Sequence, residues 1–334
     1  MKTESVLLQT LCVPCACRCR YCLLDWDGKP LGLPWERSVD FARRFKRWMD
    51  ENRPELRFSF AFGYAMEHPR PREALAFLRE IGSPQATFLQ CDGMRMRSRE
   101  ECESLTRLLA EEGVKHLNFT VYGLREYHDA FAGRRGDFEL LLRMLRAARE
   151  TGLETSAGIP LSAESAPQAD ALIELLRRET GCGKIRLFVP HQEGRGIALE
   201  PIRFSEADWE TLSPETRRLL NRQLYRPERE WLEEGAFVPE KRRSLLLSLR
   251  PDNIERWEAM APGEILAETE ALDEAYYAAF PTLPELAARY GDPKGGRFYR
   301  QRDLFAHYRR LYAAEHGVSV YDVTDERQSG SRRE

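Results

Sequence analysis

The sequence predicts an α/β fold in which six parallel strands form a partial, TIM-like (β/α)6 barrel with helices outside it. Between residues 5 and 197, short apolar runs alternate with amphipathic helical patterns. Six strand-helix units in tandem imply a parallel sheet, because each crossover helix returns the chain to the same end of the sheet. From residue 203 onward the apolar runs stop and helical patterns with charged faces follow. This change predicts a helical C-terminal extension.

Each element follows from its local pattern. The predicted strands are residues 5–12, 56–62, 86–90, 116–121, 154–159 and 184–189. The helices between them are predicted at 38–52, 72–81, 98–112, 138–151 and 167–179. Ser38 and Asp137 are expected as helix N-caps, because their side-chain oxygens can accept hydrogen bonds from the first turn. In the extension, helices are expected at 206–224, 226–234, 240–249, 265–279 and 302–316.

Composition limits the class of protein. A chain of 334 residues, 42% hydrophobic and 31% charged, can bury the core of one large domain with an appendage. We expect a barrel over 1–200, a helical extension packed on it over 201–324 and a disordered tail over 325–334. No apolar run approaches the ~20 residues of a membrane span, and no signal peptide is evident, so we expect a cytoplasmic protein. A net charge of -3 argues against a nucleic-acid partner.

Five of the eight cysteines are crowded into residues 12–22. Neighbouring cysteines on one short loop cannot reach good disulfide geometry, so metal binding is the better interpretation. Cys15, Cys19 and Cys22 form a Cys-x3-Cys-x2-Cys triad with Tyr21 before the last cysteine. Two Cys-x2-Cys pairs also occur, but only three residues separate them, where zinc modules usually place about 12 to 20.

The triad resembles the cluster motif of the radical S-adenosylmethionine (SAM) enzymes. The resemblance implies that three thiolates bind one [4Fe-4S] cluster and leave the fourth iron open for SAM. It further implies reductive cleavage of SAM to a 5'-deoxyadenosyl radical, which abstracts hydrogen from a peptide or small-metabolite substrate. Tyr21 would flank the adenine, and a flavodoxin or ferredoxin would supply the electron. The alternatives are a cluster closed by Cys12 or Cys17, which would only transfer electrons, and a non-enzymatic iron-sulfur or zinc module that retains the fold.

The strand ends extend the resemblance, since catalytic groups of such barrels gather at the C-terminal ends of the strands. Residues 62–69 stand where the family has a Gly-Gly-Glu-Pro turn for the SAM amino group, which assigns Gly63 and Glu67 to SAM. The alternative is a strand-to-helix turn with a solvated glutamate. Alternation places Asn118 and Thr120 on the lumen face of the fourth strand, where the resemblance makes them contacts of the SAM ribose and carboxylate. An asparagine satisfied by neighbouring backbone is the alternative for Asn118.

Two further segments are similar to the molybdenum-cofactor and peptide-maturase branch of the family. One contains His128 and Asp129 and introduces the fourth helix, so we expect both side chains to be structural. The other is the Gly-Arg-Gly turn at residues 194–196 after the sixth strand. Arg195 is expected either to bind the SAM carboxylate or a substrate anion, or to cap the barrel through a salt bridge.

For the remaining polar and thiol side chains, the sequence predicts a location but no specific role. His191 and Glu193 lie at the same mouth as possible substrate groups without assigned roles. Cys12 is expected as a buried side chain at the end of a strand, and Cys17 as a loop residue. No cysteine follows Cys182. We therefore expect a single cluster and no C-terminal auxiliary-cluster (SPASM) domain.

Overall fold

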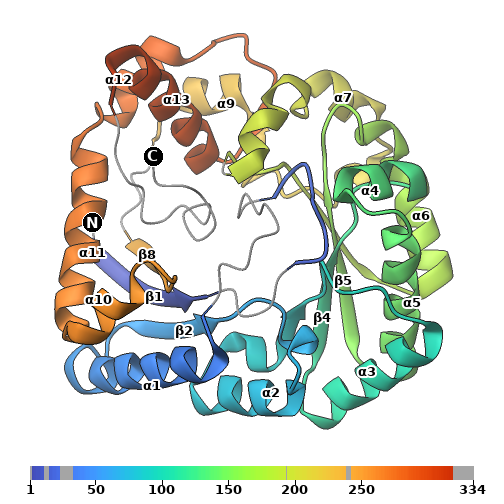
Figure 1. Cartoon of the computed structure of the whole chain (residues 1–334). Coiled ribbons are helices and arrows are strands. Elements are labelled where there is room, and N and C mark those ends of the chain that lie inside the picture. Colours follow the sequence, from blue (N-terminus) through green and yellow to red (C-terminus); the bar gives the residue numbers. More distant parts are fainter. Residues whose placement is uncertain (1, 11–14, 23–32, 193, 238–241, 319–334) are drawn as a thin grey trace.

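Two parallel sheets form the centre of the molecule, with helices around them (Figure 1). The computed structural model describes residues 2–10, 15–22, 33–192, 194–237 and 242–318. One sheet has the strand order β2-β1-β8 and the other β3-β4-β5-β6, and every pairing within them is parallel. The strands are β1 (Lys2–Gln9), β2 (Arg57–Ala61), β3 (Phe88–Gln90), β4 (His116–Thr120), β5 (Glu154–Pro160), β6 (Lys184–Phe188) and β8 (Arg242–Ser248). The predicted α/β class with parallel strands is confirmed.

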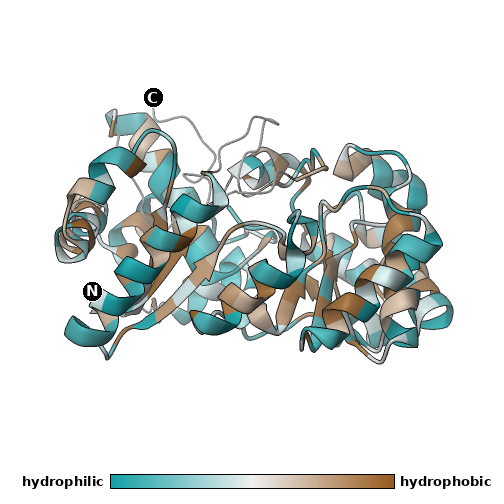
Figure 2. Ribbon diagram, turned by 60° about the horizontal axis from the view of Figure 1, so that its bottom comes forward, coloured by the Kyte–Doolittle hydropathy of each residue, from teal (hydrophilic) through white to brown (hydrophobic). Residues whose placement is uncertain are grey.

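Five of the described helices cover the outside of the sheets, namely α1 (Trp35–Asn52), α2 (Pro71–Glu80), α3 (Arg99–Glu111), α5 (Asp137–Glu150) and α6 (Ala169–Thr180). A further helix, α4 (Arg125–Ala132), packs beside residues 15–22 instead. Figure 2 shows apolar strands inside and polar outer helix faces. Side chains from both sheets, including Leu8, Phe60 and Leu117, belong to one buried apolar cluster. The amphipathic period of the helices and the burial of the strands therefore build a single core.

Both predicted N-caps are wrong. Helix α1 begins at Trp35 after Pro34, and the Ser38 hydroxyl, already inside the helix, donates to the Pro34 carbonyl at 3.1 Å. Gly136, in the left-handed conformation, occupies the N-cap of α5, so Asp137 is its first helical residue. Proline and glycine set these two helix starts through their backbone preferences, which outweigh the side-chain capping signal.

The predicted helix over 240–249 is also wrong, because this segment contains strand β8. Its Leu245 and Leu247 are completely buried and lie opposite Val6 and Leu8 of β1 in the parallel register. Alternate leucines fit the two-residue period of a strand, but a leucine-rich and arginine-rich run is compatible with a helix as well. The C-terminal extension is therefore not purely helical, since it adds a strand to the sheet.

The rest of the extension is largely helical. Its elements are α7 (Glu206–Thr211), α8 (Pro214–Arg217), β7 (Arg226–Pro227), α9 (Glu228–Glu234), α10 (Ile254–Ala259), α11 (Pro262–Ala278), α12 (Leu283–Tyr290), β9 (Phe298–Tyr299) and α13 (Gln301–His316). Pro214 starts α8 and divides the helix predicted over 206–224. Helices α12 and α13 enclose a second apolar cluster that includes Leu286, Tyr299 and Tyr308. Cys12 and the predicted tail at 325–334 lie outside the described residues.

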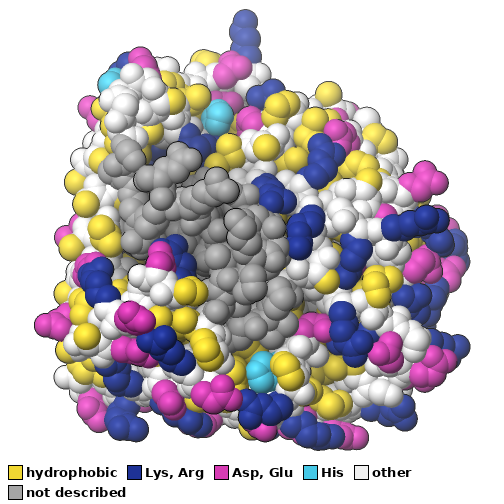
Figure 3. Space-filling model, viewed as in Figure 1, with side chains coloured by type: hydrophobic (Ala, Val, Ile, Leu, Met, Phe, Trp, Pro, Cys, Tyr) yellow, Lys and Arg dark blue, Asp and Glu magenta, His cyan; other side chains and the backbone are white. Residues whose placement is uncertain are grey.

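Acidic and basic side chains are intermixed around the rim of the face shown in Figure 3. This distribution agrees with a net charge of only -3. Among the helices within the described ranges, none combines the length and apolar character that crossing a bilayer requires.

We predict that Leu247→Ala destabilises the whole barrel. Leu247 is fully buried on β8, so truncation should lower the free energy of unfolding by about 2 to 5 kcal/mol. Chemical denaturation followed by circular dichroism measures this. Leu224→Ala is the control, because Leu224 is 52% exposed. Equal stability of the two variants would mean that β8 does not belong to the core.

Candidate functional site

The first support for the cysteine loop, residues 15–22, is the turn after β3. The Ala16 N–H donates to the Gly93 carbonyl at 2.8 Å. Gly93 has a φ of 63°, and a Cβ atom there would lie 2.1 Å from the Cys15 sulfur. The Tyr64 hydroxyl donates to the same sulfur at 3.8 Å. Glycine is therefore required at position 93 both for its backbone conformation and for the space that Cys15 occupies.

The second support is the C-terminal end of α4. The N–H groups of Arg18 and Arg20 donate to the carbonyls of Ala132 and Phe131 at 2.8 and 2.9 Å. Gly133 ends the helix in the left-handed conformation, and a Cβ there would lie 2.9 Å from the Arg18 carbonyl oxygen. Two alternate N–H groups of the loop thus satisfy carbonyls that a helix end leaves without intrahelical partners.

The thiols of the loop differ in environment. Cys15, Cys19 and Cys22 are half-buried, whereas Cys17 is buried and donates to an Asp137 carboxylate oxygen at 3.7 Å. Hydrogen bonding from Cys17 lowers the pKa of Cys15 to about 7, and the hydrogen bonds of Cys17 with Cys15 and Cys19 raise its own pKa. None of these four cysteines forms a disulfide. Within the described residues, no three His, Cys, Asp or Glu side chains converge closely enough to hold a metal ion.

A buried polar cluster contacts Cys17 through Asp137. His128 Nδ1 accepts from the Tyr122 N–H at 3.0 Å, and His128 Nε2 lies 3.0 Å from the Asp137 carboxylate. Arg134 also hydrogen-bonds to Asp137. Burial alone would raise the pKa of Asp137, but the hydrogen bonds and charges of His128 and Arg134 outweigh it and lower that pKa. With both ring nitrogens engaged and no exposed surface, His128 has the geometry of a structural residue.

Asp129 has a comparable structural geometry. Its carboxylate accepts hydrogen bonds from the N–H groups of Gly136 and Phe138 at 2.6 and 2.9 Å. These bonds satisfy N–H groups at the start of α5. The sequence assigned structural roles to His128 and Asp129, and these contacts support that interpretation.

The lumen face of the second sheet carries a polar network. The Asp92 carboxylate accepts from the Thr120 N–H at 2.7 Å and from the Thr120 hydroxyl at 2.8 Å. The Asn118 amide donates to Gln90 at 2.6 Å and accepts from Ser156 at 2.6 Å. Burial raises the pKa of Asp92 to about 6. Neighbouring side chains therefore satisfy Asn118 and Thr120, so an unmet hydrogen-bonding need is no longer an argument for a ligand at these residues.

Asp92 is a site residue that the sequence reasoning missed. It is the second residue after β3, and an acidic residue just beyond the C-terminal end of a barrel strand is a signal that could have identified it.

Glu67 and Gly63 lie on the turn after β2, as expected. Gly63 has a φ of 91°. The Glu67 side chain is only 7% exposed and pairs with the buried Arg97, and it accepts from the Arg95 N–H at 3.2 Å. Glu67 is therefore not a solvated glutamate. Its contacts with Arg95 and Arg97 connect the turn after β2 to the segment after β3.

The segment after β6 forms the third support of the cysteine loop. The Arg195 N–H donates to the Cys22 carbonyl at 2.9 Å. The Tyr21 ring lies 6.1 Å from the Phe188 ring and 6.4 Å from the His191 ring. A Cβ at Gly196 would lie 2.4 Å from the His191 carbonyl oxygen. The structure thus brings Tyr21, His191 and Arg195 together beside the loop, while Glu193 lies outside the described residues.

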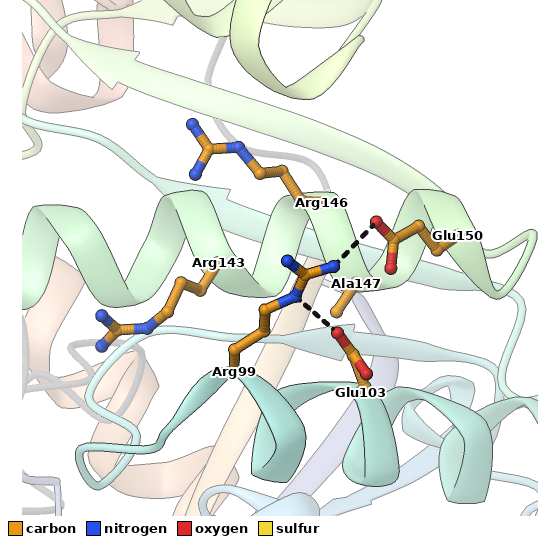
Figure 4. A pocket seen from close by; sticks show the side chains of 6 residues that line it. All are labelled: Arg99, Glu103, Arg143, Arg146, Ala147 and Glu150. Atoms are coloured by element: carbon orange, nitrogen blue, oxygen red, sulfur yellow. Dashed lines mark hydrogen bonds and ion pairs between the residues drawn. The ribbon is translucent and has the colours of Figure 1, made fainter.

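A groove on the outer surface lies between α3 and α5 (Figure 4). It is lined by Arg99, Glu103, Arg143, Arg146, Ala147 and Glu150. Arg99 pairs with Glu103 at 2.7 Å and with Glu150 at 4.0 Å. Exposed ion pairs of this kind contribute little to stability. The groove is made by helix faces rather than by strand ends, and we assign it no catalytic role.

Comparison with known proteins gives one family match and several structural likenesses. The model of the radical SAM superfamily matches residues 12–176. No curated protein matches the chain. Streptococcus suis SuiB bound to SAM has 13% identity and a TM-score of 0.45, with 63% of this chain and 46% of SuiB covered. The chain thus spans less than half of the length of SuiB.

Two further solved structures match the chain at similar identity. Coproporphyrinogen III oxidase (HemN) from Escherichia coli has 13% identity and a TM-score of 0.39, with 92% of this chain and 89% of HemN covered. The methyltransferase TsrM from Kitasatospora setae, solved with cobalamin and a [4Fe-4S] cluster, has 16% identity and a TM-score of 0.35. That comparison covers 56% of this chain and 36% of TsrM.

We predict that Gly93→Ala disrupts the cysteine loop. The added methyl group would occupy the position of the Cys15 sulfur, so iron bound per chain after anaerobic reconstitution should fall strongly. Gly113→Ala is a matched control, since Gly113 also has positive φ but has no atom within 4 Å of the added Cβ. Both variants should lose about 1 to 2 kcal/mol from backbone strain. Wild-type iron content in Gly93→Ala would show that Cys15 does not need this position.

Proposed function

Because the match over residues 12–176 places the chain in the radical SAM superfamily, we propose that Cys15, Cys19 and Cys22 hold the [4Fe-4S] cluster that this family uses with SAM. The proposal is carried by the backbone hydrogen bonds that hold residues 15–22 against the turn after β3, the C-terminal end of α4 and the segment after β6. The three cysteines of the triad form no disulfide, and the Cys17 N–H donates to the Cys15 sulfur at 3.4 Å. Such hydrogen bonds to cysteine sulfurs are typical of iron-sulfur sites.

The SAM site is formed by groups around this loop. When bound, the reduced cluster supplies the electron that cleaves SAM to a 5'-deoxyadenosyl radical. Tyr21 flanks the adenine, and Gly63 and Glu67 receive the amino group. The Glu67 carboxylate pairs with Arg97, but a carboxylate has about four acceptor positions and can take a further N–H donor.

Asn118, Thr120 and Arg195 complete the SAM contacts. Thr120 donates its hydroxyl proton to Asp92, which leaves the hydroxyl oxygen able to accept from a ribose hydroxyl. The guanidinium of Arg195 binds the SAM carboxylate or a substrate anion. Its backbone contact with Cys22 fixes its segment beside the cluster loop.

The substrate is a peptide or a small metabolite, and a flavodoxin or ferredoxin reduces the cluster. SuiB has been solved with its precursor peptide SuiA. Residues 183–334 contain no cysteine, so this part of the chain offers no thiol ligand for a second cluster. We also propose that residues 1–200 are the catalytic barrel domain and that residues 201–324 are its extension.

SAM cleavage tests the function directly. Anaerobically reconstituted protein should bind iron and, after dithionite reduction, convert SAM to 5'-deoxyadenosine. Zinc binding without SAM cleavage would instead identify the non-enzymatic module.

We predict that alanine at Cys15, Cys19 or Cys22 removes nearly all cluster iron, because a three-cysteine site has no spare ligand. Cys12→Ala and Cys17→Ala should retain iron. Cys102→Ala is the control for loss of a buried thiol outside the loop. Iron analysis and the visible spectrum give the result. Equal iron loss in Cys12→Ala or Cys17→Ala would contradict the open-iron assignment.

We predict that Thr120→Val weakens SAM binding while the cluster spectrum stays intact. Loss of one buried hydrogen bond should cost about 1 to 3 kcal/mol, or roughly five- to a hundredfold in affinity. Anaerobic titration with SAM measures the change. Thr106→Val is the control, because the buried Thr106 hydroxyl donates to the Ala147 carbonyl on the outer helices. Unchanged affinity of Thr120→Val would remove Thr120 from the SAM site.

A further inference from the structure

The loop after β6 is held by the C-terminal helix α13. The Gln192 N–H donates to Asp303 at 3.3 Å, and Arg310 donates to the Gln192 carbonyl at 2.8 Å. Asp303 lies in the first turn of α13 and is 1% exposed. Arg300 donates to both Asp303 oxygens, at 2.7 and 3.1 Å. The extension therefore brings a buried carboxylate to the mouth of the barrel.

His191 is the residue that faces this carboxylate. Its Nδ1 lies 3.6 Å from Asp303 Oδ2, an ion-pair distance slightly longer than a hydrogen bond. Nδ1 is buried and has no hydrogen-bond partner among the described residues, yet the side chain is 21% exposed, so the exposed part of the side chain excludes Nδ1. The ring stacks on Phe188 at 6.2 Å and lies 6.4 Å from Tyr21. Nδ1 of His191 is thus turned to Asp303, while another part of the side chain reaches solvent beside the cysteine loop.

We propose that His191 accepts a proton from the substrate through Nε2, with Asp303 as the positioning residue that keeps the ring proton on Nδ1. This inference rests on the proposed function and adds a catalytic residue to it. The Asp303 carboxylate can accept the Nδ1 proton, which leaves the Nε2 lone pair available. The two residues are called the His191–Asp303 pair below.

The protein contains a structural His–Asp pair for comparison. His128 is fully buried, and both of its ring nitrogens have partners, Tyr122 N–H and Asp137. His191 differs because part of its side chain is exposed at the mouth. Moreover, Arg300 already neutralises Asp303 through two hydrogen bonds, so the charge of Asp303 does not require a histidine.

The proposed step is a simple proton transfer. An O–H or N–H bond of the substrate breaks, its electron pair stays on the substrate, and a new N–H bond forms at Nε2. The resulting imidazolium is stabilised by the Asp303 carboxylate. No electron is transferred, so the step needs no additional oxidant or reductant. The substrate class is one with an ionisable hydroxyl or amino group next to the reacting carbon.

The test is diethyl pyrocarbonate labelling of the reconstituted full-length protein, read by peptide mass spectrometry at each of its six histidines. The reagent acylates an unprotonated ring nitrogen. In Asp303→Asn, the amide oxygen should stay at the Oδ1 position, because donors from both Gln192 and Arg300 point to it. The NH2 group then takes the Oδ2 position beside His191 Nδ1 and moves the ring proton to Nε2. His191 labelling should then slow by at least about fivefold, since the wrong tautomer is enforced. Asp303→Glu should restore labelling, and the exposed His316 should not change in either variant.

A wild-type measurement complements the variants in case they fold poorly. S-adenosylhomocysteine, added at saturating concentration, should slow labelling of His191 and leave His316 unchanged. Unlabelled His191 in the wild type, wild-type labelling in a folded Asp303→Asn, or the absence of protection would each overturn the inference. Formation of 5'-deoxyadenosine by the wild type is measured separately. A chain that fails that assay contradicts the proposed function itself rather than the role of the His191–Asp303 pair.

Discussion

The cysteine loop depends on backbone hydrogen bonds to other segments of the barrel. Residues 15–22 form neither helix nor strand, so the partners of their N–H and carbonyl groups come from elsewhere. Gly93 after β3 and the end of α4 supply carbonyl acceptors, and Arg195 after β6 supplies an N–H donor. These segments are positioned by strands that share one parallel sheet. The position of the thiols therefore depends on the register of the whole sheet.

Much of the fold was predictable because it follows from local periodicity. Five strands start within about two residues of the predicted positions, and the helices between them were found. Strand β8 was not predicted. Its leucine-rich segment forms a strand by pairing with the edge of β1, and β1 is far away in the sequence. Likewise Pro34, not Ser38, is the N-cap residue of α1. The fixed φ angle of proline outweighs the side-chain capping signal of the serine.

The site was predictable only where its residues are close in sequence. The spacing of Cys15, Cys19 and Cys22 by itself indicates a metal-binding motif. Contacts between residues far apart in the sequence cannot be predicted in this way, and the contact between Gln192 and Asp303 spans 111 residues. Polar lumen residues were correctly placed on one face, but alternation cannot show that Asp92 satisfies Thr120. A sequence pattern therefore identifies donors and acceptors, whereas the fold decides which of them are already paired.

The extension is coupled to both outer strands of the six-strand unit. Strand β8 pairs with β1, and on the other side the β6 residue Leu187 donates its N–H to the Leu219 carbonyl at 3.0 Å. Unpaired strand edges expose donors and acceptors that favour aggregation. Residues beyond 200 thus cover edges that an isolated partial barrel would leave open. The sequence pattern changes near residue 200, but hydrogen bonds still connect the segments on either side of this point. Because the extension is fixed to the sheets on both sides, its helix α13 can position Asp303 against His191.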